Sequence, residues 1–117
     1  MKEISRPFKD SSIRLRYLPL GNDLQVVISG GRGHIGAVAL AVCKDSEAGR
    51  ADASQIGVEG HREDELVQSA ALRLSKALCC TVAVSAGIHF DNITKTEIGA
   101  IVKIVDEMIS ELIGILG

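Results

Sequence analysis

Three histidines in the chain each stand close to a glycine and just after a stretch rich in apolar residues. His34 follows Gly-Arg-Gly, His61 follows Glu-Gly, and His89 follows Ala-Gly-Ile, while Asp64 and Asp91 stand near the second and third of them. An imidazole beside a carboxylate suits proton transfer, metal ligation or contact with a phosphate. If the preceding strands end at one edge of a sheet, these five side chains would share one cleft. Ligand binding there should change as the pH crosses about 6.5, the ordinary imidazole pKa.

The tract Gly-Gly-Arg-Gly-His-Ile-Gly at residues 30–36 offers a second kind of site. Glycines let successive backbone N–H groups converge on a phosphate, and an arginine adds a fork of donors. The candidate ligand-binding residues therefore include Gly30, Gly31, Arg32 and Gly33. The tract also matches G-x-G-x-x-G, which would mark a dinucleotide site only if a helix began at Ala37. No close His or Cys pairing requires a metal, so we expect none.

Hydrophobic periodicity predicts the elements that position these residues. Strands are expected where apolar residues alternate or where Val and Ile cluster, over residues 13–17, 24–29, 37–42, 53–59 and 81–86. Helices are expected over residues 62–78 and from 94 onward, where Thr94 and Glu97 form a capping box, while residues 87–92 form a loop. The order β-β-β-β-α-β-α predicts an α+β fold, with a largely antiparallel sheet and two long helices.

An all-alanine face is predicted on the strand at residues 37–42. Ala37, Ala39 and Ala41 share one side, and Val38 and Leu40 share the other. Small side chains let another element approach closely, so we expect a helix to pack on the alanines. A strand here also argues against the dinucleotide interpretation, which needs a helix.

Length and composition exclude several classes of protein. The 117 residues are enough for one domain, residues 1–117, in which residues 1–11 could be flexible. A net charge of −2 and an aromatic content of 3% provide neither a basic surface nor the stacking platforms of nucleic-acid binders. The apolar stretch at 98–116 contains four charged residues, which argues against a membrane span.

The cysteines and the C-terminal apolar stretch bear on location and assembly. Cys79 and Cys80 are adjacent and are expected to be inert thiols rather than a disulfide. With no apolar signal segment in the first residues, we expect a cytoplasmic protein. The predicted C-terminal helix has more apolar residues than one core face needs, which indicates a homodimer or a partner surface.

Three segments together resemble the LpdD-like prenylated flavin chaperones, which are small accessory proteins of gallate decarboxylase-type systems. They are Gly-Gly-Arg-Gly-His-Ile-Gly-Ala-Val at 30–38, Glu-Gly-His-Arg-Glu-Asp at 59–64 and Ala-Gly-Ile-His-Phe-Asp-Asn-Ile-Thr at 86–94. The resemblance implies a fold similar to that of proteasome assembly chaperones. It also implies an accessory protein, not itself an enzyme, that helps a decarboxylase catalytic subunit acquire or keep prenylated FMN or FMN.

Two other functions stay open on the residues alone. The three histidines with their acids would suit a small metal- or histidine-dependent enzyme. The glycine-rich tract would suit a nucleotide-binding module. A purified protein that retains a flavin would favour the accessory role, whereas stoichiometric metal would favour the enzyme.

Overall fold

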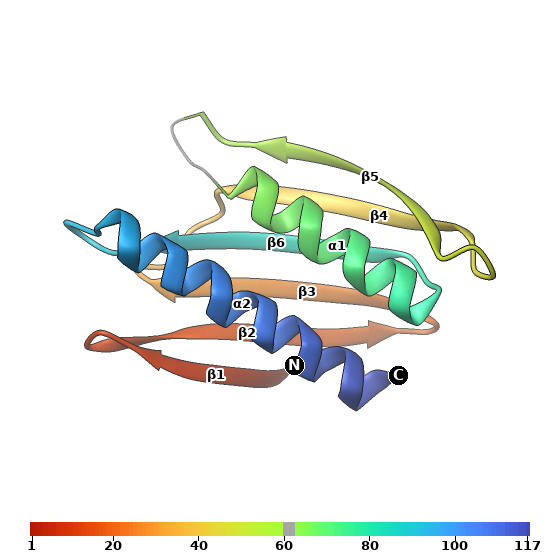
Figure 1. Ribbon diagram of the computed structural model, residues 1–117, viewed down its shortest axis with the longest axis horizontal. Helices are drawn as coiled ribbons and strands as arrows, with labels where there is room; N and C mark the ends of the chain where they lie inside the picture. The colour runs from red at the N-terminus through yellow and green to blue at the C-terminus, as the bar shows by residue number, and fades with distance from the viewer. Residues whose placement is uncertain (60–62) are drawn as a thin grey trace.

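A six-stranded sheet with both helices on one face forms the described chain, residues 1–59 and 63–117 of a computed structural model (Figure 1). The strands are β1 (Lys2–Phe8), β2 (Ser11–Leu20), β3 (Asp23–Gly31), β4 (Ala37–Asp45), β5 (Arg50–Gly57) and β6 (Val82–His89), and the helices are α1 (Asp64–Leu78) and α2 (Lys95–Leu116). Across the sheet the order is β1-β2-β3-β6-β4-β5. Among these neighbours β3 and β6 run parallel and the other pairs antiparallel. The predicted α+β class is therefore confirmed.

The first strand lies in a segment for which the sequence predicted no element. Residues of β1 pair antiparallel with β2, and Ile4 is buried against the core. Arg6 forms an ion pair of 2.8 Å with Glu111 of α2, and the rings of Phe8 and Phe90 meet edge to face with centroids 5.1 Å apart. Ile4 is the one buried side chain of β1, so the alternation of apolar and polar residues in this strand is too weak to be recognised from the sequence.

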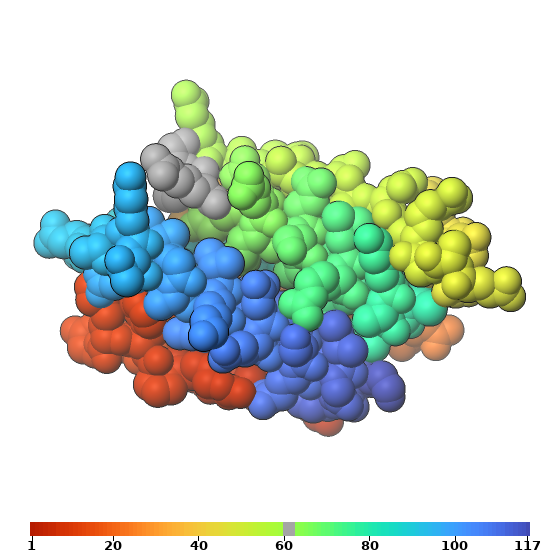
Figure 2. Space-filling model, in the orientation of Figure 1, coloured from red at the N-terminus to blue at the C-terminus, as the bar shows by residue number. Residues whose placement is uncertain are grey.

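The alanine face of β4 packs against helix α1, as the alternation predicted. Ala37, Ala39 and Ala41 are buried, whereas Val38 and Leu40 are about half exposed on the opposite face. Helix α1 contacts β4, β5 and β6, and α2 lies over β1 and β2. The side chains of both helices cover the face drawn in Figure 2.

The strand β6 runs further than the sequence indicated. Residues 87–89 were expected in a loop, but they continue the strand, because Gly87 pairs with Ser29 and His89 with Gly31 of the parallel strand β3. A glycine and a histidine are weak strand formers, so pairing with a neighbouring strand decides the structure here. His89 is therefore fixed at a strand end rather than in a loop.

Helix α2 begins with the predicted capping box. The Thr94 hydroxyl accepts from the Glu97 N–H, and the Glu97 carboxylate accepts from the Thr94 N–H. The residues buried on this helix are Ile101, Val105, Met108, Ile109 and Leu112. Ile98 and Val102, predicted on the same face, are exposed by more than two fifths. In the described part of the chain, neither helix has the length and hydropathy to span a bilayer.

Replacing Ala39 by leucine should destabilise the fold by about 1–3 kcal/mol, the usual cost of overpacking a close contact. Ala39 is only 1% exposed beneath α1, so the added carbons must displace the helix. Chemical denaturation measures the change. The matched control is Leu40→Ala on the open face of the same strand, which should change the free energy of unfolding much less because Leu40 is half exposed.

Candidate functional site

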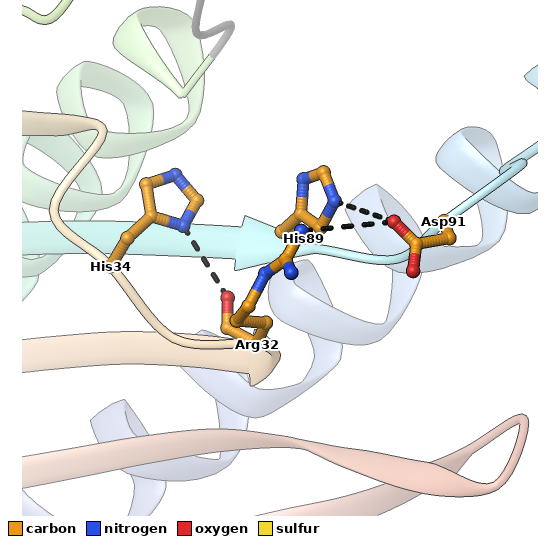
Figure 3. Close-up of polar contacts among 4 residues, drawn as sticks. All are labelled: Arg32, His34, His89 and Asp91. Carbon is orange, nitrogen blue, oxygen red and sulfur yellow. Dashed lines mark hydrogen bonds and ion pairs between the residues drawn. The ribbon is translucent and has the colours of Figure 1, made fainter.

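The ends of β3 and β6 bring two of the predicted histidines together. Because these strands are parallel neighbours, both finish at the same sheet edge, where Gly31 pairs with His89. The N–H of Arg32 donates to the His89 carbonyl at 3.0 Å, which ties the loop after β3 to the end of β6. The imidazole rings of His34 and His89 lie with their centroids 6.4 Å apart (Figure 3).

Asp91 lies beside Arg32 and His89 at this edge. Its Oδ1 lies 3.0 Å from Nε2 of His89 and 3.7 Å from Nη2 of Arg32 (Figure 3). The hydrogen bond from His89, followed by the charge of Arg32, lowers the pKa of the Asp91 carboxyl. Arg32 and Asp91 are both at least three-quarters exposed, so this cluster is open to a ligand from solvent.

His34 connects the loop to the first residue before α1. Its Nδ1 lies 3.4 Å from the carbonyl of Arg32, and its Nε2 lies 3.3 Å from Oε1 of Glu63. Both neighbours accept hydrogen bonds, so a neutral ring can donate to one of them and an imidazolium to both.

Glu63 is a site residue that sequence reasoning missed. In the sequence it appears only within the segment Glu-Gly-His-Arg-Glu-Asp at 59–64, yet its side chain is 90% buried. Oε1 accepts from the Ile88 N–H at 3.2 Å, while Oε2 is buried and has no hydrogen-bond partner among the described residues. Gly36 allows this arrangement, because a Cβ at that position would collide with the carboxylate. Only its place beside His61 and Asp64 in the sequence hinted at such a role.

Two glycines of the tract stand where a side chain would collide with neighbouring atoms at this edge. Gly31 has a φ of +62°, and a Cβ there would collide with the carbonyl of His89. A Cβ on Gly30 would meet the side chains of Ile13 and Ile88, so its lack of a side chain serves core packing. Gly33 is exposed in the loop, and no contact among the described residues assigns it to the site.

Two of the predicted residues are not placed with this cluster. His61 lies outside the described residues. Asp64 begins α1, and its carboxylate lies over Gly57, at the end of β5. Its buried Oδ1 has no hydrogen-bond partner in the described part of the chain. The site as described therefore consists of Arg32, His34, Glu63, His89 and Asp91.

The dinucleotide interpretation of the G-x-G-x-x-G match is wrong. Ala37–Asp45 is the strand β4, so no helix begins after the glycines. A dinucleotide pyrophosphate needs the N–H groups of a helix N-terminus at this point. The glycines instead carry the loop across the sheet edge from β3 to β4, past the β6 strand between them.

The fold of the chain has a counterpart among solved structures. It is similar to a chain of a chaperone complex for yeast 20S proteasome assembly, with a TM-score of 0.56 and 13% sequence identity, over 99% of this chain and 98% of that chain. At this identity the likeness shows the fold alone. No curated protein is significantly similar in sequence.

The family is defined by the sequence itself. Residues 8–117 match the family described as the prenylated flavin chaperone LpdD-like domain. The chain belongs to this family, as the three segments around the histidines and glycines indicated. A chaperone or accessory role connected with prenylated flavin follows from the family.

Proposed function

We propose that the chain binds prenylated FMN through its phosphate at the edge formed by Arg32, His34 and His89. The cofactor would then be delivered to, or kept in, the catalytic subunit of a flavin-dependent decarboxylase. The chain itself needs no catalytic residue for this role. Its task is to hold a reactive flavin until the partner enzyme takes it up.

The convergence of donors on one oxygen of Asp91 carries this proposal. Arg32 and His89 both approach Oδ1, so the edge already holds an oxygen anion between a guanidinium and an imidazole. A phosphate presents the same kind of acceptor with more oxygens and more charge. His34 stands 6.4 Å from His89, ring centre to ring centre, close enough for one phosphate to contact both. The residues present therefore fit the phosphate of FMN.

The partner and the assembly state remain predictions. A chaperone of this family implies an enzyme that receives the flavin, and we propose a decarboxylase in that role. The homodimer expected from the excess apolar residues of α2 stays a prediction, because five residues form the core face of the helix and Ile115, outside that face, is 54% exposed.

Two substitutions at the edge should change FMN affinity in opposite directions. Arg32→Ala removes the permanent positive charge and should weaken binding roughly threefold to tenfold, a modest change because the guanidinium is 75% exposed and screened by water. Asp91→Asn removes the internal anion that competes with phosphate and should strengthen binding several-fold. Quenching of flavin fluorescence measures both, first with FMN and then with prenylated FMN.

Riboflavin, which lacks the phosphate, is the control ligand for this pair of variants. Its affinity should be the same for wild type, Arg32→Ala and Asp91→Asn. Equal effects on riboflavin and FMN, or a loss of affinity in Asp91→Asn, would show that the phosphate lies elsewhere. Absence of any flavin binding to the wild-type protein would refute the proposed function.

A further inference from the structure

An apolar groove opens on the helix-covered face directly beside the phosphate edge. It encloses about 670 Å³ between the first turns of α1 and α2, on the face drawn in Figure 2. This volume falls within the range of pockets that hold small organic ligands. Its floor is formed by Ile88 near the end of β6, by Phe90 just after that strand, and by the buried Ile101 of α2.

Two apolar side chains from the same stripe of α2 as the core residues are exposed in the groove. Ile98 and Val102 of α2 are 42% and 46% exposed, and both line the groove. The sequence pattern places them on the same stripe as the buried residues of this helix, so their exposure results from the gap between α1 and α2. Contiguous apolar surface of this kind is typical of a binding site.

Glu63 contributes a buried carboxylate to the lining of the groove. Its side chain is 90% buried, and Oε2 has no hydrogen-bond partner among the described residues. Oε1 accepts from the Ile88 N–H and lies near His34, while Oε2 has almost no accessible surface and faces Gly36. The groove therefore offers a ligand apolar contacts rather than an open carboxylate acceptor.

The groove and the phosphate edge are parts of one surface. His89 lines the groove and also contacts Asp91, while Glu63 lines the groove and contacts His34. A ligand that fits both must carry an apolar body and an anionic tail. A flavin mononucleotide has these features, with an isoalloxazine ring and a phosphate at the end of its side chain.

We propose that the groove between α1 and α2 is the ring subsite for the flavin, where the exposed apolar side chains Ile98 and Val102 cover the isoalloxazine ring. This inference rests on the proposed function and extends it from the phosphate to the ring. The additional carbons of a prenylated flavin add only apolar surface, which Leu66, Ile98 and Val102 among the lining residues are suited to cover. The groove would thereby shield the reactive ring from solvent until transfer.

A charge placed in the groove tests the ring subsite. Val102→Glu should lower the affinity for FMN and for riboflavin alike, by roughly tenfold or more, because both ligands bring the same apolar ring. Ile115→Glu is the matched control, since Ile115 is 54% exposed on the same helix and lies outside the groove. Flavin fluorescence titration gives the affinities, and quenching by iodide reports whether the bound ring is shielded.

The outcomes separate the ring subsite from the proposed function. If FMN binds and Arg32→Ala weakens it, but Val102→Glu and Ile115→Glu bind flavin equally well, the ring lies elsewhere and only the groove is refuted. If the bound ring is fully open to iodide, the groove is likewise refuted. If the wild type binds neither FMN nor prenylated FMN, both proposals fail.

Discussion

Replacing Gly87 by alanine should destabilise the protein by about 2–3 kcal/mol and abolish flavin binding. A Cβ on Gly87 would collide with the backbone carbonyl of His34, which crosses β6 at this point. The loop is tied on both sides of the contact, by Gly36 N–H to the Ala86 carbonyl at 2.8 Å and by Arg32 N–H to the His89 carbonyl. Moving His34 away from the new methyl group therefore breaks backbone hydrogen bonds.

Gly99→Ala is the matched control for this substitution. Gly99 lies on the exposed side of α2, and a Cβ there would meet nothing within 4 Å. Alanine is the better helix former, so this variant should gain roughly 0.5–1 kcal/mol. Urea denaturation and FMN titration measure both variants. A Gly87→Ala protein with wild-type stability and affinity would show that the loop can leave β6 at no cost and that its position does not define the site.

The sequence predicted the histidine positions because strand ends are marked by local patterns. His34 and His89 follow apolar stretches, and a glycine stands close to each of them in the sequence. The meeting of the two residues depends on the parallel pairing of β3 with β6, which joins residues about sixty positions apart. Periodicity contains no information about such pairing, so convergence could be expected only as one of several arrangements.

The role of Glu63 could not be predicted from the sequence for a different reason. Acids at the start of a helix usually favour the positive end of its dipole and stay in water. Here α1 packs across β4 and β6, and its first turn lies over the sheet edge, where Gly36 leaves room for a carboxylate. Burial of Glu63 is thus a product of helix placement, which depends on the alanine face of β4 rather than on residues near Glu63.

The sequence predicted that α2 has an apolar stripe, but it did not predict how much of the stripe is buried. Helical spacing places seven apolar residues on one side, at positions 98, 101, 102, 105, 108, 109 and 112, and the first and third of these are exposed. The difference arises because α1 and α2 separate near their first turns and leave the groove. A helical pattern identifies the apolar face, but it cannot report how wide the covering layer is.

Replacing Leu112 by alanine should lower the free energy of unfolding by about 2–5 kcal/mol, the range for removing a fully buried leucine side chain. Leu112 has no exposed surface and belongs to the core that joins α2 to the sheet. Ile115→Ala, three residues further along the same helix, should change stability by less than about 0.5 kcal/mol because Ile115 is 54% exposed. Denaturation at several protein concentrations measures both. A large, concentration-dependent loss in Ile115→Ala would contradict this expectation and would instead place Ile115 in the predicted homodimer interface.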